Sequence, residues 1–140
     1  MNKVFLDTDV ILDLLWNREP FSEKIEIIFE EAKQNNLILS ASAVSFTTVF
    51  YFLKKYSNTE NAKKLVKSLL EIVNVLSVNE NIIKRAINFG FPDFEDAVQY
   101  FTAIENEQSI ILTRNVSDFK LKDIPAITPE DYLKIGPIRN

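Results

Sequence analysis

The sequence predicts an α/β fold: a three-layer α/β/α sandwich around a central, mostly parallel sheet of four to five strands. Short apolar runs alternate along the chain with stretches of helical length and helical periodicity. This alternation is typical of parallel strands joined by crossover helices that cover both faces of a sheet. The length of 140 residues, without repeats or an obvious linker, suits one domain over residues 1–140.

The first third of the chain predicts two strands and two helices. Residues 3–6 form an apolar run that we expect to be a buried strand, followed by a helix over residues 9–16. Pro20-Phe21-Ser22 opens a second helix, because apolar residues then recur at helical spacing at Ile25, Ile28, Phe29 and Ala32. Residues 37–39 form the next apolar run and predict the second strand.

The middle of the chain predicts three helices around one strand. Residues 42–56 form a strongly apolar helix, and Asn58 or Thr59 caps a helix that continues to about residue 72. Residues 75–78 predict the third strand. Asn79 then caps a helix that Gly90 ends, because asparagine is a preferred N-cap and glycine a preferred helix terminator.

The last third predicts the remaining elements. Asp93 starts a helix that continues to about residue 107, and residues 110–112 form the fourth strand. Residues 126–127 are a short candidate fifth strand. Thr128-Pro129-Glu130-Asp131 begins a final short helix with proline at its first position, where its missing N–H costs nothing.

Composition narrows the chemistry that the protein can perform. Cysteine is absent, which excludes disulfides and thiolate sites and favours a cytoplasmic location. Histidine is absent too, so no imidazole can serve as base, nucleophile or metal ligand. The chain contains only two glycines, which is too few for a glycine-rich phosphate loop. Catalysis would therefore depend on carboxylates, Lys, Tyr, Ser or Thr, or on a bound metal.

The net charge of −4 does not by itself favour a nucleic-acid partner, since phosphate contacts require lysine and arginine. Bound divalent cations and local basic clusters, such as Lys54-Lys55 and Lys63-Lys64, would offset this charge. A basic partner protein is the other interpretation. No stretch reaches the ~18 apolar residues of a membrane span, so we expect no membrane association.

Acidic residues gather after the predicted strands, where ligands of parallel α/β sheets bind. The polar residues at these positions are Asp7, Thr8 and Asp9 after the first strand, Asp93 and Asp96 at a helix start, and Thr113, Arg114, Asn115 and Asp118 after the fourth strand. Carboxylates that share a pocket repel one another unless a cation binds between them. Oxygen-only ligands favour Mg²⁺ or Mn²⁺, which also promote phosphodiester cleavage.

Each acid also has a plainer structural explanation. Asp93 is a good N-cap, and Asp96 would then complement the helix dipole. Asp9 is a candidate cap of the first helix, Asp118 a candidate turn residue, and Asp13 a candidate solvated helix acid. The argument for a site therefore rests on several acids occurring together at strand ends.

The chain resembles the PIN-domain ribonucleases, and among them the VapC-type toxins of toxin–antitoxin pairs, from Val4 to about Leu133. Three segments carry the resemblance in order: Phe5-Leu6-Asp7-Thr8-Asp9-Val10-Ile11-Leu12, Asp93-Phe94-Glu95-Asp96-Ala97-Val98 and Thr113-Arg114-Asn115-x-x-Asp118-Phe119. The resemblance implies a PIN-like fold, a Mg²⁺ or Mn²⁺ cofactor, an RNA substrate, a small antitoxin partner and a homodimer. One departure is Thr48, which stands near the position where the family usually carries a glutamate.

The resemblance also implies roles for individual residues. The implied catalytic acids are Asp7, Asp93, Asp96 and Asp118, of which Asp7, Asp96 and Asp118 would bind metal. The residues implied to orient ligands or substrate are Thr8, Asp9, Thr48, Thr113, Arg114 and Asn115. The resemblance thus implies a metal-dependent ribonuclease. Two alternative functions remain open.

The first alternative is a catalytically weakened PIN-like module that binds RNA or protein, as the missing glutamate permits. The second is a haloacid-dehalogenase-like phosphatase, whose first motif is similar to Asp7-Thr8-Asp9-Val10. In that family the late acids would follow a strand directly, whereas Asp93 follows a predicted helix end. The helix around residues 46–53 is apolar nearly all round, which predicts core packing or an interface for a second copy or an antitoxin.

Overall fold

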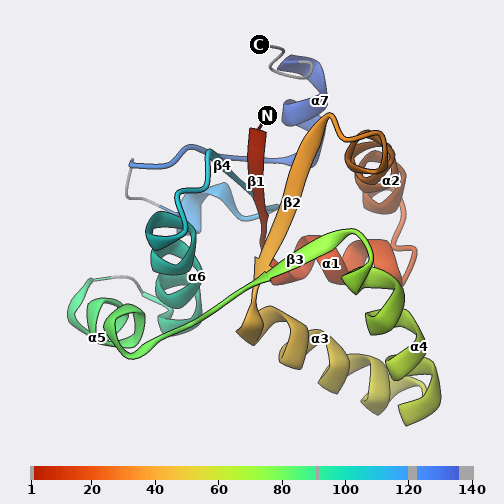
Figure 1. Cartoon of the computed structure of the whole chain (residues 1–140), viewed down its shortest axis with the longest axis horizontal. Coiled ribbons are helices and arrows are strands. Elements are labelled where there is room, and N and C mark those ends of the chain that lie inside the picture. The colour runs from red at the N-terminus through yellow and green to blue at the C-terminus, as the bar shows by residue number, and fades with distance from the viewer. Residues whose placement is uncertain (1, 91, 120–122, 136–140) are drawn as a thin grey trace.

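Five parallel strands form one sheet with the order β3-β2-β1-β4-β5 (Figure 1). The computed structural model describes residues 2–90, 92–119 and 123–135. The strands are β1 Asn2–Leu6, β2 Leu37–Ser42, β3 Val73–Leu76, β4 Ile110–Leu112 and β5 Ala126–Ile127. The predicted α/β class and parallel sheet are therefore confirmed.

Seven α-helices within the described residues cover the two faces of this sheet. They are α1 Thr8–Leu15, α2 Phe21–Lys33, α3 Ala43–Tyr56, α4 Thr59–Leu70, α5 Glu80–Asn88, α6 Phe94–Glu105 and α7 Pro129–Ile135. Val4 and Leu6 of β1 pack in a core cluster with residues of α1 to α4 and α7, whereas Phe5 packs with α5 and α6. Because alternate strand residues face opposite sides, the result is the predicted three-layer sandwich.

Both faces of β1 are covered, so its central residues are apolar without alternation. Val4, Phe5 and Leu6 are all fully buried. Each such side chain stabilises the fold by roughly 1.5–3 kcal/mol relative to an exposed position. This continuous run is what made the strand recognisable in the sequence, and it fixes the point from which Asp7 leaves the sheet.

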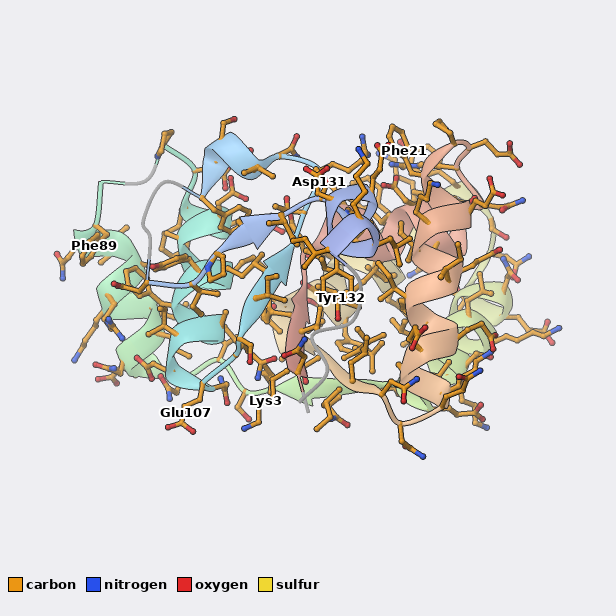
Figure 2. The ribbon with its side chains drawn as sticks, turned by 90° about the horizontal axis from the view of Figure 1, so that it is seen from above. Lys3, Phe21, Phe89, Glu107, Asp131 and Tyr132 are labelled. Atoms are coloured by element: carbon orange, nitrogen blue, oxygen red, sulfur yellow. The ribbon has the colours of Figure 1, made fainter. Side chains whose placement is uncertain are left out.

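The last helix closes the layer that contains α2. Tyr132 points from α7 into the core, while Asp131 on the neighbouring position faces solvent (Figure 2). Burial of Tyr132 in the core therefore attaches this short helix to the domain. No helix in the described part of the chain has the length and apolar character needed to cross a membrane.

Two strands differ from the sequence prediction. The second was predicted at residues 37–39, whereas β2 continues to Ser42. The prediction placed the third strand at residues 75–78, whereas β3 spans Val73–Leu76. Val73 pairs with Leu39 and is buried, while Val75 is exposed at the sheet edge. The apolar run from residue 72 to residue 78 leaves this register open, and pairing with β2 decides it.

The strand order creates a crevice at the carboxyl ends of β1 and β4. The connection after β1 leads to β2 on one side, and the connection after β4 leads to β5 on the other, so the chain leaves these two neighbouring strands in opposite directions. Leu6 pairs with Leu112, and the backbone N–H of Asp7 donates to the carbonyl of Leu112 at 3.0 Å. The residues that follow β1 and β4 therefore begin at the same edge of the sheet.

Candidate metal centre

Asp7 is held rigidly at the end of β1, where it is also the N-cap of α1. Its Oδ1 accepts from the backbone N–H of Thr8 at 2.8 Å, and its Oδ2 accepts from the Thr113 hydroxyl at 2.8 Å. The side chain of Asp7 is only 6% exposed. Thr113 lies directly after β4 and also accepts from the backbone N–H of Asn115 at 3.0 Å. The carboxylate is thus oriented from both strands of the crevice.

The rim of the crevice carries two further acids. Asp9, in the first turn of α1, accepts from the Asn115 side-chain amide at 3.1 Å. Asp118 ends a short 3₁₀ helix, Val116–Asp118, and its backbone N–H donates to the Asn115 carbonyl at 2.9 Å. Asn115 therefore ties the loop after β4 to the start of α1.

The N-terminus of α6 brings three acids to the same place. Asp93 is the N-cap, and its Oδ1 accepts from the backbone N–H of Asp96 at 3.1 Å. Glu95 and Asp96 occupy the first turn, where the partial positive charge of the helix end favours carboxylates. The capping explanation for Asp93 is therefore correct. The same residue also lies beside the other acids of the site.

These elements enclose a hollow of about 370 Å³ that we call the acidic hollow. Its lining residues are Asp7, Thr8, Asp9, Leu12, Arg18, Thr48, Phe52, Asp93, Glu95, Asp96, Asn115 and Asp118. The structure thus brings all four expected catalytic acids together, along with Thr8, Asp9, Thr48 and Asn115. Thr113 lies behind Asp7, and Arg114 lines a neighbouring hollow instead.

The pKa of Asp7 is raised from 3.8 to about 6, mainly by burial and to a lesser degree by the negative charges of Asp9 and Glu95. The hydrogen bonds from Thr113 and Thr8 act in the opposite direction, because they favour the ionised form. The carboxyl is consequently held in place by donors while its charge is disfavoured by its surroundings. A cation beside it would relieve that cost.

The pKa of Asp96 is raised from 3.8 to about 7. Burial is the largest cause, followed by the negative charges of Asp93, Asp7, Asp118 and Glu95. Burial and the charges of Asp93 and Asp9 also raise the pKa of Glu95. Acids from three separate segments therefore repel one another across the acidic hollow.

The donor chemistry of the acidic hollow fits a hard divalent cation. Its polar lining offers carboxylate, hydroxyl and amide oxygens and no nitrogen or sulfur ligand of histidine or cysteine. Within the described ranges, no three acidic side chains are close enough to form a ready-made metal-ligand group. Mg²⁺ commonly uses one or two carboxylates and keeps several waters, so this spacing suits it better than an all-protein cage.

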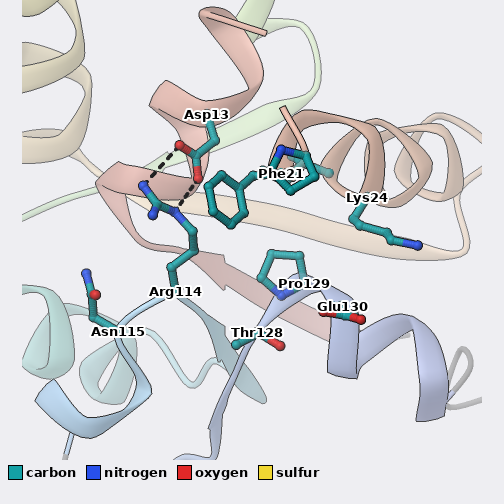
Figure 3. Close-up of a pocket in the computed structure, with 10 residues that line it drawn as sticks. Asp13, Phe21, Lys24, Arg114, Asn115, Thr128, Pro129 and Glu130 are labelled. Atoms are coloured by element: carbon teal, nitrogen blue, oxygen red, sulfur yellow. Dashed lines mark hydrogen bonds and ion pairs between the residues drawn. The ribbon is translucent and has the colours of Figure 1, made fainter. Parts of the chain in front are cut away.

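A second hollow of about 510 Å³ adjoins the first through Asn115, which lines both (Figure 3). Arg114 lies here: its Nε donates to Asp13 Oδ2 at 2.6 Å, and its guanidinium lies 4.3 Å from the ring centre of Phe21. Asp13 is fully buried and also accepts from Arg18 at 3.3 Å. The expectation of a solvated Asp13 is therefore wrong, because two arginines compensate its charge.

A buried polar network behind Asp7 was not predicted from the sequence. Gln99 of α6 is only 1% exposed. Its Nε2 donates to Thr8 Oγ1 at 2.9 Å and to Ser45 Oγ at 2.6 Å, while its Oε1 accepts from Ser42 at 2.6 Å. The sequence did carry one sign of this network: polar residues occur on otherwise apolar helix faces. The network joins α6 to the starts of α1 and α3.

Comparison with known proteins agrees with this architecture. The sequence model of a family described as PIN domain matches residues 3–117. A search of curated protein sequences gave no significant match. Solved structures do match, and they share the fold at low sequence identity.

Three of these structures come from different bacteria. VapBC-1 from nontypeable Haemophilus influenzae has a TM-score of 0.69 at 23% identity, covering 91% of this chain and 98% of that one. A toxin–antitoxin complex from Klebsiella pneumoniae has a TM-score of 0.64 at 21% identity, covering 90% and 97%. VapC20 from Mycobacterium tuberculosis, a sarcin-ricin loop cleaving toxin, has a TM-score of 0.61 at 12% identity, covering 77% and 86%. Since the family match extends over most of the chain, from the start of β1 past β4, the protein is a member of the PIN domain family.

Proposed function

We propose that this protein is an endoribonuclease that hydrolyses RNA phosphodiester bonds with Mg²⁺ or Mn²⁺ bound in the acidic hollow. The observation that supports this best is the convergence of six acidic side chains on one hollow at the sheet edge. Among them, Asp7 and Asp96 have pKa values raised towards neutrality. Such a cluster persists in a fold mainly where a cation compensates it.

In this proposal Asp7 and Asp96 would hold the ion directly and Asp118 would bind it directly or through a water, and the ion would supply Lewis acidity and a water of lowered pKa. Asp7 is suited to this role because each of its oxygens already accepts one hydrogen bond from a fixed donor. Its remaining lone pairs are thus directed without further ordering of the side chain. Thr8 and Thr113 orient the ligand and do not themselves bind the ion.

The remaining acids act around that centre. Asp93 is fixed by its capping bond to the backbone N–H of Asp96, which also holds the first turn of α6 beside the ion. Asp9 is oriented by Asn115. Thr48 lines the acidic hollow, where its hydroxyl can hold a water but contributes no charge.

The toxin role, an antitoxin partner and a homodimer are part of the same proposal. Support comes from the fold shared with the Haemophilus, Klebsiella and Mycobacterium proteins, which are VapBC or toxin structures. We also propose that residues 1–140 form a single domain that acts in the cytoplasm. Membership of the PIN family argues against the phosphatase alternative, which we do not carry further.

The decisive experiment measures cleavage of a single-stranded RNA with Mn²⁺, with Mg²⁺ and with EDTA. We expect Asp7→Asn and Asp96→Asn to lower the cleavage rate by at least roughly a hundredfold, because each removes a charged ligand. Glu107→Gln is the matched control, since this exposed acid precedes β4 and lies near Lys3 at the amino end of the sheet (Figure 2). Full activity of both aspartate variants would contradict the assignment.

A PIN-like binding module without catalysis is the second candidate. Thr48 favours it, because a hydroxyl lines the acidic hollow near the position where the family usually has a glutamate. RNA binding that persists while no cleavage occurs at any Mn²⁺ concentration would support this candidate and exclude the nuclease.

A further inference from the structure

We infer that a third hollow, which also lies next to the acidic hollow, binds an unpaired base of the RNA strand by stacking. We call it the aromatic hollow, and its lining residues are Trp16, Arg18, Phe52 and Tyr56. This inference rests on the proposed ribonuclease function and extends it to the form of the substrate: a single strand with at least one unpaired nucleotide beside the cleaved bond.

The aromatic hollow adjoins the acidic hollow. Arg18 and Phe52 line both of them. A chain whose phosphate lies among the acids therefore has its neighbouring nucleotide beside the aromatic rings. No rearrangement of the described residues is needed for this path.

The rings lie at the protein surface and are only partly buried in the core. Phe52 and Tyr56 are stacked, with centres 6.2 Å apart and planes inclined by 10°, and Trp16 meets both edge-on. Tyr56 is 64% exposed, and Tyr51, which contacts Phe52, is 59% exposed. Trp16 and Phe52 are half-buried and pack partly against the core. The two tyrosine rings are so exposed that they add little to folding stability, so packing between α1 and α3 does not explain them.

Positive charge lies on the same surface. The Arg18 guanidinium lies 5.0 Å from the centre of the Trp16 ring, and Lys55 Nζ lies 5.4 Å from that of Tyr56. Lys54 precedes Lys55 in the exposed last turn of α3. None of the described residues that line the aromatic hollow is acidic, in contrast to the acidic hollow. In a protein with a net charge of −4, this grouping of cations with aromatic rings is complementary to phosphate and base together.

The aromatic hollow suits an RNA strand better than a peptide, because it offers contacts for both the base and the phosphate of a nucleotide. The exposed ring faces suit the planar base, and the flanking cations suit the backbone that carries it. A duplex would not fit, because its bases are already stacked on one another and their faces are covered. The expected ligand is thus single-stranded RNA.

The protein contains its own probe for this contact, because Trp16 is its one tryptophan. The experiment titrates Asp96→Asn protein, in Mg²⁺, with short oligoadenosine and follows tryptophan fluorescence. We expect saturable quenching by the single strand and none by its duplex with oligouridine. Quenching by both, or by neither, would overturn the inference.

Variants then separate binding from cleavage. In the otherwise native protein, Tyr56→Ala and Lys55→Gln should raise KM for single-stranded RNA by roughly tenfold and leave kcat unchanged, since stacking contributes to binding of the neighbouring base. Leu70→Ala and Lys67→Gln are matched controls at the exposed end of α4, next to the amino end of β3. Equal KM values for all four variants would contradict the aromatic hollow even if cleavage itself is confirmed.

A protein bound in the aromatic hollow instead of RNA would give a different experimental result. If Tyr56→Ala weakens binding of the antitoxin and leaves KM for RNA unchanged, the surface is a protein groove and the inference is wrong. If native protein shows no cleavage and oligoadenosine still quenches Trp16 in the Asp96→Asn protein, the ribonuclease proposal fails while the stacking site stands.

Discussion

At Asp7, two structural requirements oppose each other. The hydrogen bonds from Thr8 and Thr113 favour the carboxylate form, whereas burial and neighbouring acids raise its pKa to about 6. A side chain chosen for stability alone would avoid this conflict. Perturbed acids in a hollow often mark functional sites, and this conflict at Asp7 is one reason for the proposed metal centre.

Thr48 provides a gain-of-function test at the scale of one residue. Thr48→Glu adds a carboxylate to the wall of the acidic hollow, so we expect Mn²⁺ to bind roughly tenfold more tightly. Isothermal titration calorimetry measures this directly. Thr47→Glu is the matched control, because Thr47 is the neighbouring exposed residue and does not line the acidic hollow. Equal affinity in both variants would mean that no ion binds near Thr48.

Single residues were also where sequence reasoning reached its limit. The acids after β1 and β4 and at the start of α6 were identified, because strand ends and helix caps leave local signals. The pairing of Asp13 with Arg114 was not, since these residues are 101 positions apart, and nothing local showed that Arg18 would pair with the same buried carboxylate. The same is true of Gln99, whose partners lie on other elements.

At the scale of elements, α6 combines two tasks in its first turn. Asp93 caps the helix, and the same turn presents Asp96 to the acidic hollow. Further along, Gln99 fixes the helix against the starts of α1 and α3 through buried hydrogen bonds. The position of the acids therefore depends on how α6 is anchored as much as on the acids themselves.

Replacing the anchor should loosen the site. Gln99→Leu leaves the hydroxyls of Thr8, Ser42 and Ser45 without their amide partner, so we expect a loss of about 1–3 kcal/mol in unfolding free energy. Urea denaturation measures this loss. Gln108→Leu is a suitable control, because Gln108 is also buried but its side chain makes a single hydrogen bond among the described residues, from Nε2 to the carbonyl of Asn106 at 3.0 Å, and its Oε1 has no partner there. A larger loss for Gln108→Leu would contradict the anchoring role.

Element boundaries were predictable where the sequence carries caps or continuous apolar runs. The N-caps at Asn58, Asn79 and Asp93 are as predicted, because their side chains bond the first turn in each case. The register of β3 was not predictable, since pairing with β2 selects among several similar apolar residues. Local signals thus defined the helices, and tertiary contacts defined the edge of the sheet.

At the scale of the whole molecule, the strand order assembles the site. Asp7 and Asp96 are 89 positions apart in the sequence, yet both line the acidic hollow because β1 and β4 are neighbours and α6 precedes β4. The parallel sheet was predictable from the alternation of elements, and with it the edge at which the acids meet. Their mutual pKa effects required the three-dimensional arrangement.

The raised pKa values predict how stability depends on pH without divalent cations. Asp96 has a pKa of about 7 in the folded protein and 3.8 in its unperturbed state, so the folded protein binds more protons between these values. Its contribution to stability therefore falls as pH rises from about 4 to about 7. We expect Asp96→Asn to be more stable than the native protein at about pH 8, and the advantage to vanish near pH 4.

Thermal unfolding in EDTA across this pH range measures the difference between the two proteins. Adding Mn²⁺ at about pH 8 should reverse the order, because binding to the folded state raises the midpoint of the native protein alone. A difference that does not change with pH would mean that Asp96 is not under the repulsion described.

The most direct test of a shared cation is a crystal structure of the native protein grown with millimolar Mn²⁺, with anomalous diffraction used to locate the metal. We predict a manganese ion in the acidic hollow with carboxylate oxygens of Asp7 and Asp96 at roughly 2.2 Å, the range usual for oxygen ligands of such ions. An acidic hollow without an anomalous peak, or an ion bound elsewhere and away from both aspartates, would contradict the account.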